Sequence, residues 1–358
     1  MKKLAILMAV VLCCCLLVGC GGKTESAPAE ESAVQANDNT NTPASEPVAS
    51  KDADERQVDN PTSEYQTYSS ESAYTIGITL QNLDLESITT MKKMLEEDLD
   101  NNYPNVKYSI LDAKNDQSTQ LQQVEVFLAQ GVDAVILNPV DQEGAQTAVE
   151  ACAEAGVPCF TLLQKVSDMS MIAAHSGMDH TESAALSVSY GMELLGGKGS
   201  IADIEGPIGI SAQILRTAGL HDIMTQYPET ELVYEETANW ARDEAMALAE
   251  NWLQSGTQID MFFCQCDNMA MGVVKACEEA NVRPYIVSID GDKDAIQALI
   301  DGRLDCTVAI NYADMCYHSI DNCIAYLDGQ MYNDEYYCQL VLITHENAEE
   351  MMNTYFGN

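Results

Sequence analysis

The chain has 358 residues, a formal net charge of −39 and thirteen cysteines. Acidic residues outnumber basic residues by 56 to 17, which argues against a nucleic-acid partner and against docking on an anionic membrane surface. We interpret the charge as a source of solubility and not as a cation site.

The first twenty residues predict export. Two lysines precede an apolar run over residues 4–18 that is too short to span a bilayer comfortably, as in a signal peptide. The letters LVGC at residues 17–20 resemble the lipobox of bacterial lipoproteins, in which the cysteine is diacylated. We expect a lipoprotein signal peptide over 1–20 and an extracytoplasmic protein, anchored to the cell membrane by a lipid on Cys20. An ordinary secretory signal with a chance cysteine is the alternative.

Residues 21–72 have the composition of a disordered tether. They are rich in Ser, Thr, Ala, Pro, Asn, Asp and Glu, and almost their only aliphatic residues are Val34, Val48 and Val58. Such a segment buries too little apolar surface to offset its chain entropy. We expect it to hold the folded part away from the membrane.

Nine cysteines remain when the four in the signal region are set aside. An odd number cannot all pair, and their spacing does not resemble a small secreted disulfide framework. Most lie among Val, Ala and Ile, where a free cysteine acts as a small hydrophobic residue. We predict that they are mainly reduced and buried.

From residue 74 onward, short aliphatic strands alternate with amphipathic helices, a pattern typical of parallel sheets with crossover helices. The expected strands are 75–80, 106–111, 134–137, 159–162, 200–204, 261–264 and 285–289. Three helices between them have an apolar face of 3.6-residue period. These faces hold Leu121, Val124 and Leu128; Ala145, Ala148, Val149 and Cys152; and Met269, Gly272, Val273, Ala276 and Ala280.

About ten strand–helix alternations are too many for one open sheet, so we expect an α/β fold with two doubly wound parallel-sheet lobes. Ligands of such sheets bind at the carboxyl ends of the strands. The residues at those ends are mostly polar, as a hydrogen-bonding pocket requires. They are Gln81, Asn138, Gln164, Cys266, Asp290 and Asn311.

Several segments near these strand ends resemble the type I periplasmic binding proteins for galactose, glucose and ribose. They are NDQS (115–118), LAQGVDA (128–134), NPVD (138–141), CDNMAMG (266–272) and IDG (289–291). Their order and spacing carry the resemblance over roughly 74–344. It implies a hinge of three crossings between the lobes. One lobe would hold 73–176 plus 312–338, and the other 177–311 plus 339–358.

Three ligand-binding positions of that family appear in this sequence. The resemblance implies that Arg216 donates to sugar oxygens, that Trp240 stacks on a pyranose and that Asp290 accepts from hydroxyls. Taken singly, each residue also has a structural interpretation: a paired helix arginine, a loop tryptophan covering a lobe and a turn aspartate.

Other positions depart from the family pattern. They are Cys266 in place of an asparagine, Leu85 and Ser87 near the first helix, Leu163 with Gln164 beside it, and Ile310 or Asn311 at the last cleft strand. The half-site of the first lobe is therefore expected to be more apolar. A deoxy sugar, a derivatised sugar or another polyol-like solute fits it better than a plain hexose. We nevertheless include Gln81, Gln164, Cys266 and Asn311 among the expected ligand-binding residues.

Other chemistry has little support in the sequence. Cys264 and Cys266 are one residue apart, so a thiol redox or metal site is a minor alternative. His175 and His180 have the wrong spacing for one helical face. The calcium loop of the galactose/glucose-binding protein has no counterpart over 191–199, so we expect no structural metal. The sequence has no nucleophile elbow, phosphate loop or catalytic-triad spacing, so we expect no cofactor and no enzymatic activity.

The resemblance implies a monomeric solute-binding lipoprotein that delivers a sugar or polyol-like molecule to an ABC permease in the membrane. A sensor that presents its ligand to a membrane kinase or chemoreceptor is the alternative. The two roles share a fold and a pocket, so the sequence leaves both open.

Overall fold

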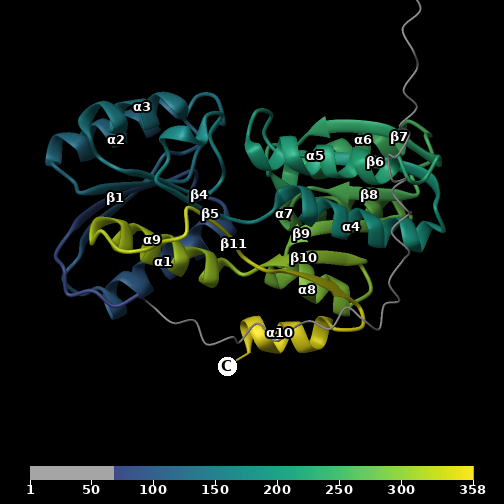
Figure 1. Ribbon diagram of the computed structural model, residues 1–358. Coiled ribbons are helices and arrows are strands. Elements are labelled where there is room, and N and C mark those ends of the chain that lie inside the picture. Colours follow the sequence, from purple (N-terminus) through teal and green to yellow (C-terminus); the bar gives the residue numbers. More distant parts are fainter. Residues whose placement is uncertain (1–67, 358) are drawn as a thin grey trace, which may run out of the picture. The chain divides into compact units, whose positions relative to one another are not determined.

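The computed structural model describes residues 68–357, which belong to one compact unit of the chain. They form two α/β lobes, each built on a six-stranded sheet (Figure 1). The two-lobed fold expected from the sequence is therefore confirmed. The predicted signal peptide, the lipobox cysteine and all but the end of the predicted tether lie outside the described residues.

The first lobe has a fully parallel sheet with the strand order β11-β5-β4-β3-β1-β2. Helices α2 and α3 cover one face, and α1 and α9 cover the other (Figure 1). The elements are β1 (Thr75–Leu80), α1 (Glu86–Asn102), β2 (Lys107–Asp112), α2 (Gln117–Gln130), β3 (Ala134–Leu137), α3 (Gln146–Ala155), β4 (Cys159–Leu163), the 3-10 turn η2 (Met169–Met171), β5 (Ala174–Gly177), α9 (Tyr312–Leu327) and β11 (Glu335–Tyr337).

The second lobe has the strand order β12-β10-β9-β8-β6-β7, in which only the β10–β12 pair is antiparallel. Helices α4 and α5 pack on one face, and α6, α7 and α8 pack on the other. The elements are α4 (His180–Leu195), β6 (Lys198–Glu205), α5 (Ser211–Met224), β7 (Glu229–Thr237), α6 (Arg242–Gln254), β8 (Met261–Cys264), α7 (Asp267–Ala280), β9 (Tyr285–Asp290), α8 (Lys293–Ile300), β10 (Cys306–Ile310), β12 (Leu340–Thr344) and α10 (Ala348–Phe356).

Both faces of each sheet are buried, which explains why the central strands are almost continuously aliphatic. All four residues of β3 and all four residues of β8 are buried. The chain passes between the sheets after β5, after β10 and after β11, so the hinge has three crossings. These crossings bring the carboxyl ends of both sets of parallel strands to the same region.

The predicted apolar face of α2 is confirmed, because Val124 is buried in the core and Leu121 and Leu128 pack against it. Two further residues of α2 are also buried, Gln120 and Phe127. Gln120 is buried because its amide donates to the carbonyl of Asn138 at 2.9 Å and accepts from the backbone N–H of Val140 at 3.0 Å. A buried polar side chain satisfied in this way cannot be recognised from apolar periodicity.

All nine cysteines that follow the signal region are free and buried in the structure, as predicted. Burial raises the pKa of the Cys264 and Cys266 thiols well above the usual value, so both stay protonated and poorly nucleophilic. Within residues 68–357 no cluster of three or more His, Cys, Asp or Glu side chains has a geometry suited to a metal ion.

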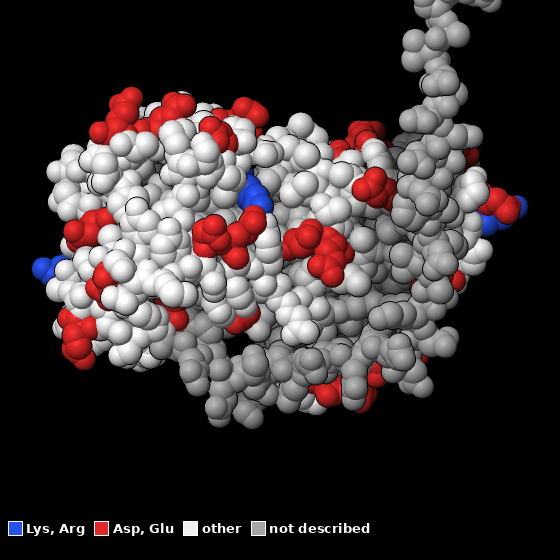
Figure 2. Space-filling view, viewed as in Figure 1, with Lys and Arg blue, Asp and Glu red and all other residues white. Residues whose placement is uncertain are grey.

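Carboxylates are spread over both lobes, and few Lys or Arg side chains are visible on the face shown in Figure 2. No basic patch for a polyanion is present on that face, in agreement with the composition. None of the helices in the described part of the chain is both long and apolar enough to cross a membrane.

Candidate ligand-binding cavity

A cavity between the two lobes encloses about 550 Å³ of space outside atoms, part of it open to solvent. Its walls come from the carboxyl ends of strands and the helix starts that follow them, as expected for parallel sheets. The lining residues are Gln81, Leu85, Glu86, Ser87, Ile88, Leu163, Gln164, Ala212, Arg216, Trp240, Cys266, Asn268, Asp290, Asp292, Ile310 and Tyr312.

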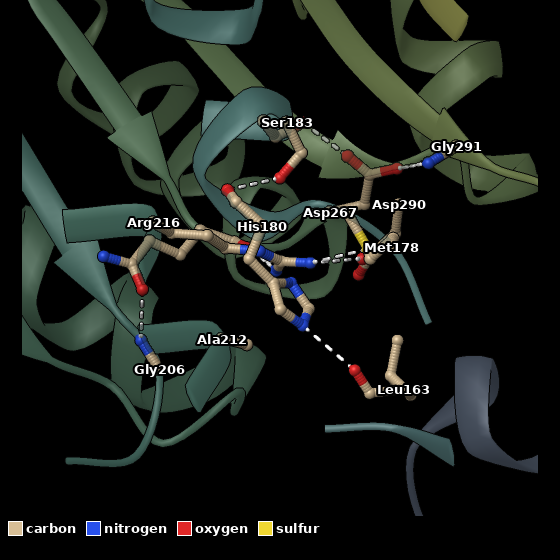
Figure 3. Close-up of polar contacts among 12 residues, drawn as sticks. Leu163, Met178, His180, Ser183, Gly206, Ala212, Arg216, Asp267, Asp290 and Gly291 are labelled. Atoms are coloured by element: carbon tan, nitrogen blue, oxygen red, sulfur yellow. Dashed lines mark hydrogen bonds and ion pairs between the residues drawn. The ribbon is translucent and has the colours of Figure 1, made fainter. Parts of the chain in front are cut away.

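Arg216, in the second turn of α5, is only 4% exposed. Its Nη1 donates to the carbonyl of Gln265, and its Nη2 lies 3.7 Å from both Met178 Sδ and Asp290 Oδ1 (Figure 3). Its Nε is buried and has no hydrogen-bond partner among the described residues. A buried donor without a partner is costly, so this guanidinium has donor capacity that a ligand oxygen would satisfy.

Trp240 lines the cavity because the chain turns sharply in front of α6. Asn239 and Trp240 have positive φ angles of 53° and 62°, and the Trp240 carbonyl accepts a hydrogen bond from Asn268 Nδ2 at 2.7 Å. The Arg216 guanidinium carbon lies 5.6 Å from the centre of the Trp240 ring, within the range of a cation–π contact. Gly206 packs against the ring so closely that an added Cβ would lie 2.1 Å from it.

Asp290 is the last residue of β9 and has an unusual φ of 134°. Burial raises the pKa of its carboxyl group to about 8, although Arg216 opposes this shift. The next residue, Gly291, has a φ of 79° and approaches Ala309 closely, so a side chain would not fit there. The turn thus directs Asp290 toward the cavity.

A second carboxylate, that of Asp267, stabilises this turn by hydrogen bonds to its backbone. Asp267, fully buried at the start of α7, accepts hydrogen bonds from the backbone N–H groups of Gly291 and Asp292, both at 2.8 Å. It also accepts from the hydroxyls of Thr307 and Ser288. Asp267 is therefore fully engaged within the protein and supports the cavity without lining it.

His180 lies beside Arg216 on the hinge side of the site (Figure 3). Burial lowers the pKa of His180 well below its usual value, and the neighbouring Arg216 lowers it further. His180 Nε2 lies 3.3 Å from the carbonyl of Leu163. Because this histidine is neutral at ordinary pH, Arg216 is the only cationic side chain among the described residues that line the cavity.

The wall from the first lobe combines apolar and polar residues, so it is less apolar than the departures from the family pattern predict. Leu85, Leu163 and the crossing residue Ile310 all line the cavity. Gln81 lines it from the end of β1. Gln164 lines it too, but its side-chain oxygen accepts from Ser211 and Ala212 of the opposite lobe, so it is engaged in an interlobe contact.

Six of the seven expected ligand-binding residues thus lie around one cavity, and Asn311 does not. Asn311 caps α9, accepting from the backbone N–H of Asp314 at 3.1 Å. It lines a neighbouring cavity beside α10, while Ile310 faces the main one. An asparagine directly before a helix is a preferred N-cap residue, which explains its position.

Four polar lining residues were not singled out from the sequence: Glu86, Asn268, Asp292 and Tyr312. Each lies within the first two residues of a helix or immediately before it. The rule that ligands lie at strand ends also covers the helix starts that follow those strands. The first residues of the helices that follow the strands are therefore also expected to line a site of this kind.

Comparison with known proteins agrees with this geometry. Residues 76–331 match the model of the periplasmic binding protein domain. The chain belongs to the periplasmic binding protein family. The binding protein is 30% identical over 236 residues to the ribose import binding protein of Bacillus subtilis, covering 66% of this chain and 76% of that one. It is 30% identical over 286 residues to a putative rhizopine-binding protein of Rhizobium meliloti, covering 78% and 92%.

A solved structure supports the same assignment. An ABC transporter solute-binding protein from Bacillus halodurans with bound myo-inositol is 32% identical and superposes with a TM-score of 0.76, covering 80% of this binding protein and 100% of that chain. The family consists of sugar-binding solute receptors of ABC transporters that act outside the cytoplasm, and not of enzymes. Membership of this family does not support the minor thiol or metal alternative.

Proposed function

We propose that this binding protein captures a sugar or polyol-like molecule in the interlobe cavity and delivers it to an ABC importer. The observation that carries the proposal is the joint placement of Arg216, Trp240 and Asp290 around one cavity. Together they offer a planar donor, a large ring for the C–H face of a polyol and an acceptor for hydroxyl groups. The myo-inositol bound to the relative from Bacillus halodurans supports a cyclic polyol as the kind of ligand.

The apolar lining residues, Leu85 and Leu163 of the first lobe and Ile310 at the end of β10, narrow the class of ligand. Leu85, Leu163 and Ile310 offer no hydrogen bonds, so hydroxyl groups facing them would lose their water without compensation. A ligand with a deoxy, methyl or other apolar substituent on that side avoids this cost. We therefore favour a substituted sugar or polyol over a plain hexose.

A thermal-shift panel of sugars and polyols, run on the full-length chain in detergent, tests this function. A ligand present at a hundred times its dissociation constant should add about 2.7 kcal/mol to the free energy of unfolding. We expect at least one compound to stabilise the wild type. The same compound should not stabilise the cavity variant Trp240→Ala. A panel without any stabilising compound would count against a sugar or polyol receptor.

The same proposal includes the lipid anchor on Cys20, which the sequence predicts. Fatty-acid labelling of cells should mark the wild-type protein and not the Cys20→Ser variant. Equal labelling of both would contradict the anchor. A sensor role would use the same cavity, and no observation favours it over import.

A further inference from the structure

The charges that line the cavity do not balance. Arg216 is the only cationic side chain among its described lining residues, whereas three carboxylates line it: Glu86, Asp290 and Asp292. Arg216 lies 3.7 Å from Asp290 and so compensates that charge in part. Glu86 and Asp292 have no ion-pair partner among the described residues.

Asp292 has an unusual role for an aspartate at its position. It is the N-cap residue of α8, yet its side chain makes no capping hydrogen bond with the helix. An aspartate at an N-cap normally accepts from the first turn, a contact worth about 1 kcal/mol. The carboxylate of Asp292 instead lines the cavity and accepts no hydrogen bond from the described residues.

Arg242 lowers the pKa of Asp292 from outside the cavity, but its guanidinium is already engaged. Arg242 donates to Asp294 Oδ2 at 2.5 Å through its Nη2 and to Asn268 Oδ1 at 3.1 Å through its Nε. Burial raises the pKa of Asp292 well above its usual value, and the neighbouring Asp267 and Glu86 raise it further. A cation bound on this side of the cavity would favour the ionised form of Asp292 and offset its repulsion by Glu86.

A metal ion fits this site poorly, because the described carboxylates do not form a cluster with metal-binding geometry. The opposite side of the cavity has a different character, since Arg216 has an unpartnered buried Nε and Trp240 presents a large ring. The ligand must therefore combine a positive charge at one end with oxygens and an apolar face at the other.

We propose that the ligand is a sugar or cyclic polyol carrying a protonated amino group, with the ammonium on the side formed by Asp292 and Glu86 and its oxygens facing Arg216. This inference rests on the proposed function, since it assumes that the interlobe cavity is the ligand site. It adds the chemical class of the ligand, an amine-bearing polyol, and gives Asp292 the role of selecting it.

Calorimetry on the full-length chain in detergent tests the inference with matched pairs: D-glucosamine against D-glucose, D-galactosamine against D-galactose, and an amino-deoxy-inositol against myo-inositol. In at least one pair the amine should bind ten-fold or more tightly than its hydroxyl parent. Its affinity should fall as salt is raised, because exposed charge interactions are screened.

Variants assign the preference to the acidic side of the cavity. Asp292→Asn and Glu86→Gln should each weaken binding of the amine at least ten-fold and change binding of the parent less than three-fold. The matched control is Asp84→Asn, which removes the same charge from an exposed residue just before α1 that does not line the cavity. The melting temperature of each variant shows whether it is folded.

The possible failures are distinguishable. If the hydroxyl parent binds at least as tightly as the amine in every pair that binds, the cavity is a polyol site and the inference is wrong while the proposed function stands. If the amine is preferred but Asp292→Asn and Glu86→Gln leave that preference intact, the assigned site is wrong. If neither member of any pair binds, the inference is contradicted, and the thermal-shift panel decides separately whether the proposed function stands.

Discussion

The side-chain oxygen of Gln164, in the first lobe, accepts a hydrogen bond from the hydroxyl of Ser211, in the second lobe, at 2.7 Å. The same oxygen accepts from the backbone N–H of Ala212 at 3.0 Å. The N-cap residue of α5 is Ile210, which has no side-chain acceptor, so one lobe supplies the cap for a helix of the other. Because α5 also holds Arg216, this contact couples the position of the lobes to the geometry of the cavity.

Removing this contact should weaken the closed arrangement of the lobes. Ser211→Ala removes its hydroxyl bond to Gln164 and the one from the backbone N–H of Lys165. At about 0.5–1.5 kcal/mol for each of the two hydrogen bonds, ligand affinity should fall by roughly five- to 150-fold. Small-angle scattering should show a smaller compaction on ligand addition than in the wild type. Unchanged affinity and compaction would contradict the coupling, and the exposed Ser170→Ala is the control.

The close packing of Gly206 on Trp240 gives a test of the stacking surface without removing it. A Cβ at position 206 would lie 2.1 Å from the ring, so Gly206→Ala must displace the indole. Ligand affinity should fall by about 1–3 kcal/mol, as for Trp240→Ala. Trp252→Phe removes the other tryptophan, so that fluorescence reports Trp240 alone. If the Gly206→Ala variant has the same Trp240 emission and the same ligand affinity as its Gly206 parent, the position of the ring does not depend on this contact.

Asp98 on α1 predicts a pH-dependent loss of stability. It is 2% exposed, its Oδ2 has no hydrogen-bond partner among the described residues, and burial raises its pKa to about 7. The folded protein therefore retains a proton that the unfolded chain releases near pH 4, so this stability is full at low pH and is lost as the pH rises through 7.

Asp98→Asn removes this dependence. The unfolding free energy of the variant minus that of the wild type should rise by on the order of 2–4 kcal/mol from pH 4 to pH 8. Urea unfolding at several pH values measures the difference, with the exposed Asp100→Asn as control. A constant difference between wild type and Asp98→Asn over this range would contradict the assigned protonation.

The sequence predicted most of the fold and part of the site, for identifiable reasons. Strands buried on both faces, such as β1, β3 and β8, appear as short aliphatic runs and were predicted with the bounds observed. Strand β7 was not among the strands expected from the pattern. It lies at the edge of its sheet and reads ETELVYEET, so its burial is incomplete and its pattern weak.

For the cavity, the predictable residues lie at the carboxyl end of a strand, as Asp290 does, or just after it, as Gln81 does. Asn311 has the same sequence context but caps a helix, and one sequence position decides between these two roles. The acidic character of the site was missed because Glu86 and Asp292 come from different lobes and converge only in the fold. In a chain with 56 acidic residues, two more carboxylates carry no distinctive signal.

The nine buried cysteines give a prediction independent of the ligand. Alkylation of the denatured, unreduced protein should label most of the nine, and mass spectrometry counts the labels. The native protein should be labelled slowly, because burial hides the thiols and raises the pKa of Cys264 and Cys266. Four defined disulfides in the unreduced protein would contradict the free thiols of this structure.

Calorimetric titration of the ligand into the wild type, Arg216→Lys, Trp240→Ala and Asp290→Asn tests the central claim most directly. Each substitution removes one element of the cavity: the two-pronged donor, the stacking ring or the charged acceptor. If the interlobe cavity is the ligand site, all three variants should remain folded and bind more weakly. The expected losses are about 1–3 kcal/mol for Trp240→Ala and about 1.5–3 kcal/mol for Asp290→Asn. Wild-type affinity in all three variants would show that the ligand binds elsewhere.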